Sequence, residues 1–139
     1  MSPIFIDTSF ITALCASQER WHADAQACWA SVVGQRRRFV TTTFVLDEVV
    51  TFLNTRGHHA LAVETGQQIL ESPAFGLIHV EDGLLSRGWD YFVRHSDKRY
   101  SLTDCISFVV MQERSVASAL AFDHHFVQAG FQVLPAVGP

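Results

Sequence analysis

The sequence lacks several features that would mark out whole classes of protein. It has only three cysteines, Cys15, Cys28 and Cys105, and no C-x-x-C pair, so neither a zinc ribbon nor a disulfide framework is supported. It has no run of about 18 apolar residues, which excludes a membrane-spanning helix, and its first residues do not resemble a signal peptide. Reduced thiols and the lack of a membrane segment predict a cytoplasmic protein.

Positive charge is also scarce. Ten Lys and Arg residues stand against 14 Asp and Glu, which gives a net charge of −4 and a pI of about 5.9. A polyanion would therefore have to be met by a local basic patch or by metal ions rather than by the protein as a whole. Hydrophobic residues, in contrast, make up 48% of the chain, enough for a globular core. At this length we expect one domain over residues 1–139 that folds without disulfides or a structural metal.

Short apolar segments alternate with longer amphipathic ones along the chain. We predict strands at residues 4–6, 39–41, 75–80, 116–121 and 131–134. We predict helices at 10–16, 22–33, 43–55, 58–71, 81–95 and 103–114, the first of them capped by Thr8 or Ser9 and the last one buried. This alternation predicts an α/β fold, a three-layer α/β/α sandwich around a mostly parallel sheet.

Three aspartates lie where a sheet of this kind places a ligand site, outside the carboxyl ends of its strands. Asp7 follows the first predicted strand, Asp123 follows the strand at 116–121, and Asp104 begins the apolar helix at 103–114. Carboxylates that gather at one edge repel one another. Mg²⁺ or Mn²⁺ relieves that repulsion because these ions prefer oxygen ligands.

Each carboxylate also has a purely structural explanation. Asp7 and Asp104 stand at the beginnings of helices, where a carboxylate can act as a cap, and Asp123 lies in a segment of turn composition. The third predicted helix offers both Asp47 and Glu48, which flank its apolar stripe from opposite sides, so periodicity does not choose between them. The joint placement at one sheet edge favours a metal site over these separate explanations.

Other chemistries need residues that this sequence lacks. Aspartyl-phosphate enzymes need Asp-x-Asp after the first strand, and here Ser9 occupies the second position. A receiver domain needs a lysine near the site, and the only lysine, Lys98, lies in a predicted loop. No G-x-x-x-x-G-K-[ST] motif is present. We interpret Cys105 as a small buried hydrophobe. The adjacent histidine pairs are interpreted as surface residues, and the three tryptophans as packing or interface residues rather than base-stacking platforms.

The segments around the acids resemble the PIN domain and, within it, the VapC-like toxins of prokaryotic toxin–antitoxin pairs. The matching segments are Ile6-Asp7-Thr8-Ser9, Val45-Leu46-Asp47-Glu48-Val49-Val50, Leu102-Thr103-Asp104-Cys105 and Ala121-Phe122-Asp123-His124-His125-Phe126. The resemblance implies that the catalytic residues and metal ligands are Asp7, Glu48, Asp104 and Asp123, with Ser9 and Thr103 in support. It is this resemblance, and not the helix geometry, that selects Glu48 over Asp47.

The implied activity is that of an endoribonuclease that uses Mg²⁺ or Mn²⁺ to hydrolyse RNA phosphodiester bonds. As a toxin it would be held inactive by a cognate antitoxin that inserts a segment into the acidic groove. The aromatic-rich composition suits an interface with that partner or a homodimer. We expect Arg94, Lys98 and Arg99 to contact the RNA backbone. The alternatives are a non-toxin PIN nuclease in RNA processing and a non-catalytic RNA- or partner-binding PIN module, which a complete set of acids disfavours.

Overall fold

The computed structural model describes residues 2–136 and contains one five-stranded sheet. Its strands are β1 (Ile4–Ile6), β2 (Phe39–Thr42), β3 (Phe75–Ile78), β4 (Ser118–Leu120) and β5 (Gln132–Leu134). They lie in the order β3-β2-β1-β4-β5, and every neighbouring pair is parallel. The α/β prediction is confirmed, and the sheet is parallel throughout because every connection crosses over through a helix.

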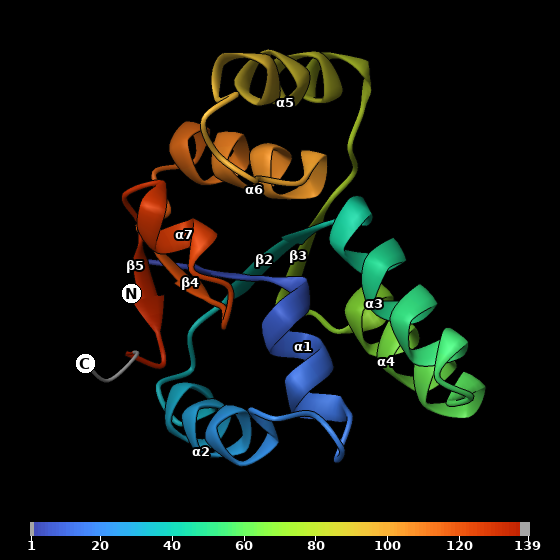
Figure 1. Ribbon diagram of the computed structural model, residues 1–139. Helices are drawn as coiled ribbons and strands as arrows, with labels where there is room; N and C mark the ends of the chain where they lie inside the picture. The colour runs from blue at the N-terminus through green and yellow to red at the C-terminus, as the bar shows by residue number, and fades with distance from the viewer. Residues whose placement is uncertain (1, 137–139) are drawn as a thin grey trace.

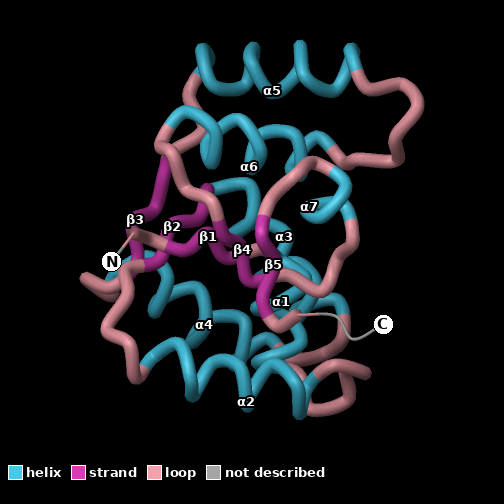
Figure 2. The backbone as a smooth tube through the Cα atoms, turned by 90° about the vertical axis from the view of Figure 1, so that its left-hand side faces the viewer, coloured by secondary structure: helices cyan, strands magenta, loops and turns pink. Residues whose placement is uncertain are grey.

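The helices lie on both faces of the sheet. They are α1 (Thr8–Cys15), α2 (His22–Val33), α3 (Thr43–Thr55), α4 (His59–Glu71), α5 (Asp82–Arg94), α6 (Leu102–Glu113) and α7 (His125–Gln128). Figures 1 and 2 show α5 and α6 on one side and α1 to α4 on the other, which confirms the three-layer prediction. None of the helices in residues 2–136 has the length and apolar character needed to cross a membrane.

The core is built around β1 and α6. All three residues of β1 are buried, and so is the continuous stretch of α6 from Thr103 to Met111, as its apolar composition predicts. α6 packs closely against α5 at Gly88, where a Cβ atom would lie 2.4 Å from Cγ1 of Ile106. A glycine is needed there because the two helices approach too closely for any side chain. This packing fixes the beginning of α6 over the sheet.

The strand order changes direction between β1 and β4. From β1 the chain first adds β2 and β3 on one side, and only then returns to add β4 and β5 on the other. The two neighbouring crossovers therefore leave in opposite directions. In parallel sheets, ligands bind at such a switch point, and the region outside the carboxyl ends of β1 and β4 is called the crevice below.

Candidate active site

Asp7 follows β1 directly and lies at the crevice. Its side chain is the N-cap of α1: Oδ2 accepts hydrogen bonds from the Ser9 amide at 3.2 Å and from the Ser9 hydroxyl at 2.7 Å. The prediction that Thr8 or Ser9 caps this helix is wrong, because the helix begins at Thr8 and the carboxylate reaches forward to it. Asp7 is only 3% exposed. Ser9 thus orients the first acid, as the resemblance implied.

The same hydroxyl joins the ends of the two central strands. Oγ of Ser9 accepts a hydrogen bond at 3.0 Å from the backbone amide of Phe122, the residue before Asp123. One small side chain therefore sets the position of the segment after β4 relative to Asp7.

Glu48 enters the site from α3. Its Oε1 accepts a hydrogen bond at 2.7 Å from the hydroxyl of Thr8, the neighbour of Asp7. Asp47, in contrast, is exposed and accepts a bond at 3.4 Å from Thr51 on the same helix. Of the two acids that periodicity left open, the structure joins Glu48 to Thr8, the residue after Asp7.

Asp104 lies at the third position of α6, where it forms a capping box with Ser101. The Ser101 amide donates to Oδ2 of Asp104 at 3.1 Å, and the Asp104 amide donates to the Ser101 hydroxyl at 3.0 Å. The helix-start explanation therefore holds for this residue alongside its place in the site. Thr103 is buried next to Asp104, and its backbone carbonyl accepts a hydrogen bond from the Ser107 hydroxyl.

The side chains of Asp123 and Asp104 are bridged by His125, a residue that the sequence analysis assigned to the surface. Nδ1 of His125 lies 3.0 Å from Oδ2 of Asp104 and 3.1 Å from Oδ1 of Asp123. The His125 amide also donates to Oδ1 of Asp123, at 2.8 Å. The His125 side chain is 16% exposed and stands edge-on to the Tyr100 ring. The surface interpretation is wrong for His125, whereas His124, at 74%, is exposed.

A sequence signal for His125 did exist. It stands two residues after Asp123, the spacing at which an aspartate side chain accepts the amide of a tight turn. That turn begins α7 and directs the His125 ring back toward α6. α7 itself was not predicted because four residues are too few to show a helical period.

Burial dominates the electrostatics of the site. Burial, together with the charges of Asp104 and Asp123, raises the pKa of Asp7 to about 7 against hydrogen bonds from Ser9 that lower it. Burial also raises the pKa of Asp104, with Asp123 adding to the effect and the Ser101 amide and His125 opposing it. Within residues 2–136 the ion pairs of these acids are with histidines, and none involves lysine or arginine.

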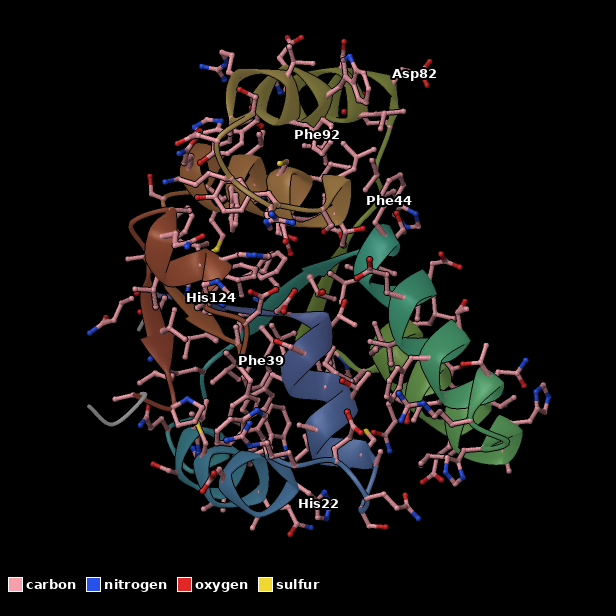
Figure 3. The ribbon with its side chains drawn as sticks, in the orientation of Figure 1. His22, Phe39, Phe44, Asp82, Phe92 and His124 are labelled. Atoms are coloured by element: carbon pink, nitrogen blue, oxygen red, sulfur yellow. The ribbon has the colours of Figure 1, made fainter. Side chains whose placement is uncertain are left out.

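The donor set fits a hard divalent cation. Four carboxylates, which follow β1, lie on α3 and α6 and follow β4, would be oxygen ligands for such an ion. Burial raises the pKa of Asp7, the charges of Asp104 and Asp123 add to the effect, and a cation would oppose both. A ligand atom from each of Asp123, His124 and His125 also lies within 4.8 Å of the others. In Figure 1 the first turns of α1, α3 and α6 and the segment before α7 face one another at this end of the sheet, and Figure 3 labels His124 there.

The predicted RNA-contacting cations lie outside this cluster. Arg94 ends α5, where its guanidinium donates to the Asp90 carbonyl and lies over the Tyr91 ring. Lys98 pairs with its neighbour Asp97 at 3.4 Å, and Arg99 is exposed. The loop that carries them reaches the acids through Tyr100 and Ser101, and the contact of these cations with RNA stays a prediction.

Comparison with known proteins agrees with this geometry. Residues 4–132 match the family model of the PIN domain. The 23S rRNA-specific endonuclease VapC20 of Mycobacterium tuberculosis is 38% identical over 128 residues, which cover 92% of this chain and 95% of that protein. The crystal structure of Mycobacterium tuberculosis VapC20, described as a Sarcin-Ricin loop cleaving toxin, has a TM-score of 0.85 over the same shares of the two chains. FitAcB from Neisseria gonorrhoeae, 14% identical over 94% of this chain and 95% of its own, shares the fold with a TM-score of 0.63. With its fold and nearly its whole length matched, this chain belongs to the PIN-domain family, among the VapC-like proteins.

Proposed function

We propose that this chain is the ribonuclease toxin of a toxin–antitoxin pair and that it cleaves RNA with the help of a divalent metal. The observation that carries the proposal is the meeting of Asp7, Asp104 and Asp123 outside the carboxyl ends of β1 and β4, where Glu48 joins them through Thr8. In the described residues, the ion pairs of these acids are with histidines. An acidic site of this kind meets a negatively charged substrate through metal ions.

The roles of the residues follow from their contacts. Asp7, Glu48, Asp104 and Asp123 would hold Mg²⁺ or Mn²⁺, which when bound activates a water molecule and stabilises the charge on the attacked phosphate. The hydroxyls of the residues after Asp7 fix two of these carboxylates, since Thr8 donates to Glu48 and Ser9 donates to Asp7.

His125 has a different role from the carboxylates. Its ring holds the side chains of Asp104 and Asp123 at a fixed separation before the substrate arrives. A metal site whose ligands are held in place in this way is preorganised, so less ordering is needed when the ion binds.

The proposed substrate is ribosomal RNA, and within it the sarcin–ricin loop. The support is the 38% identity to VapC20, a 23S rRNA-specific endonuclease, over 92% of this chain. The proposed place of action is accordingly the cytoplasm, where ribosomes work. Cleavage of an unrelated structured RNA at an equal rate would contradict this choice of substrate.

Cleavage should depend on the metal and on Glu48. Incubated with an RNA hairpin that carries the sarcin–ricin loop, the purified protein is expected to cleave it in Mg²⁺ or Mn²⁺ and to stop on addition of EDTA. Glu48→Gln should lower the rate at least tenfold, because a neutral amide is a poorer ligand for a hard cation. Denaturing gel electrophoresis of the labelled RNA measures both effects.

Asp47→Asn is the matched control, since it removes one negative charge from the residue before Glu48 in α3, which is exposed and lies outside the crevice. It should cleave at the wild-type rate. RNA binding without turnover in either metal would favour the non-catalytic binding module instead.

Two protein partners belong to the proposal: a small antitoxin, which a short adjoining reading frame would encode, and a second copy of this chain. The support for self-association is the outer face of α5, where Leu85, Trp89, Phe92 and Val93 are each 38 to 58% exposed. Sedimentation equilibrium should give a dimer for the wild type and a monomer for Trp89→Glu, which would place a charge in the apolar contact. A monomeric wild type would remove the homodimer from the proposal.

A further inference from the structure

A stack of three aromatic rings runs from the core to the surface beside the acids. The rings of Phe10 and Phe122 lie 5.6 Å apart and 5° from parallel, and those of Phe122 and Trp21 lie 5.5 Å apart and 4° from parallel. Phe10 is fully buried, Phe122 is half-buried and Trp21 is 37% exposed. The stack therefore ends in an exposed indole ring whose orientation is set by the two rings beneath it.

The stack is tied to the proposed active site through its middle ring. Phe122 precedes Asp123, and its amide donates to the Ser9 hydroxyl, which in turn donates to Asp7. The position of the exposed ring is thus linked by one aromatic contact and two hydrogen bonds to the carboxylate of Asp7. A group that lies on Trp21 has a defined place relative to the cleaved bond.

A cavity opens next to this ring. It has a volume of about 730 Å³ and lies between α2 and the segment after β5, with Trp21 and Phe122 among its lining residues. The rest of its lining is mostly apolar, from Cys28, Val32 and Leu134, with Asp24 as a charged group. Its volume is within the range of small-molecule sites, and a nucleobase with its ribose is smaller than the cavity.

A positive charge lies against the exposed ring of Trp21. The guanidinium carbon of Arg20 lies 4.5 Å from the centre of the Trp21 ring, and Arg20 is exposed. Because the side chain is free at the surface, it can move from the ring to a phosphate when a flat group takes its place. A flat apolar ring beside a guanidinium is the combination that single-stranded nucleic-acid sites use for a base and its phosphate.

We propose that this cavity is a base-binding subsite, in which an unpaired nucleobase of the RNA stacks on Trp21 next to the bond that is cleaved. The inference rests on the proposed function and gives it a positioning residue. The tryptophans are interpreted from the sequence as packing or interface residues rather than base-stacking platforms. Trp21 does pack on Phe122, and its exposed part is here given the base-stacking role as well. Stacking on an aromatic ring does not distinguish one base from another, so the subsite selects unpaired nucleotides rather than a sequence.

Binding of short RNA separates this role from the chemistry. We would measure fluorescence anisotropy in Ca²⁺ with a labelled, mixed-sequence RNA decamer and with an abasic decamer of equal charge. Base–aromatic stacking predicts that Trp21→Leu binds the normal decamer about tenfold more weakly than the wild type. Trp21→Phe, which keeps a ring, should restore most of that loss. The abasic decamer should bind Trp21→Leu and the wild type equally.

The outcomes are distinct. Equal binding of the normal decamer by Trp21→Leu and the wild type would overturn the subsite, and so would an equal loss on both decamers, which would mean that the substitution only disturbs packing. Unchanged RNA binding together with weaker capture of the antitoxin would assign the cavity to a protein partner. Absence of cleavage in Mg²⁺ by a wild-type protein that shows the expected binding pattern would refute the proposed function alone.

Discussion

Asp7→Asn is expected to lower RNA cleavage by about 10³-fold or more, as expected when a metal that contributes several kcal/mol to the transition state loses a ligand. The same variant should unfold at a higher temperature than the wild type at pH 8 in EDTA. Asparagine remains a good N-cap, so the bonds from Ser9 to this side chain can be kept. The substitution removes the buried carboxyl group of Asp7, whose pKa burial raises to about 7 and which is charged at pH 8. Loss of activity with a gain in stability is the signature of a site whose charges serve function at the expense of the fold.

Asp90→Asn is the matched control for this variant. Asp90 is exposed on α5, away from the acids, so the same chemical change should alter neither the rate nor the unfolding temperature by more than a small amount. Cleavage by Asp7→Asn at the wild-type rate would show that Asp7 is not a ligand. A lower unfolding temperature for Asp7→Asn would show that the carboxylate is needed for the cap rather than tolerated there.

The metal-free protein should lose stability as the pH rises from about 4 to about 7. Burial raises the pKa of Asp7 in the folded protein to about 7, whereas an unfolded chain ionises it near its ordinary value of 3.8. Between these values the folded state keeps a proton that the unfolded state releases, so the free energy of unfolding falls with increasing pH and levels off above 7. At about 1.4 kcal/mol for each pKa unit, the change is of the order of 4 kcal/mol. Asp104, whose pKa burial also raises, acts in the same direction.

Urea unfolding at pH 5, 6, 7 and 8 in EDTA measures this dependence. The difference between the wild type and Asp7→Asn isolates the contribution of Asp7, because all other titrating groups are shared. Excess Mg²⁺ at pH 8 should return much of the lost stability to the wild type and little to the variant. A difference between the two proteins that stays constant from pH 5 to pH 8 would refute the pKa assignment for Asp7.

Much of the fold follows from local patterns in the sequence. Helix α2 was predicted with the bounds His22–Val33 because Gly34 and three arginines end its apolar period, and α3 agrees equally well with its predicted range. Strand ends were less certain, as at β4, predicted over 116–121 and observed over Ser118–Leu120. An apolar run shows that a segment is buried, but where hydrogen bonding to the neighbouring strand stops depends on that neighbour. α7 was missed for lack of length.

The site residues, like the fold, could be predicted only in part from the sequence. The rule that ligands bind at strand ends indicated that Asp7, Asp104 and Asp123 would lie together, and the structure places them around one crevice. The choice of Glu48 needed either a family resemblance or the contact with Thr8, since both faces of the helix beside its stripe carry an acid. The place of His125 in the site was not predicted, because it depends on a turn that Asp123 itself forms and that residue types alone do not reveal.

The strand order has a consequence for how the enzyme comes into being during translation. β1 and its aspartate are synthesised well before β4, the neighbouring strand that completes this end of the sheet. A nascent polypeptide that ends before Ser118 already carries three of the acids. It lacks both Asp123 and the backbone amide of Phe122, which donates a hydrogen bond to the Ser9 hydroxyl. Such an unfinished chain lacks one of the four carboxylates, so the metal site that we propose forms only after β4 and the segment that follows it have been synthesised.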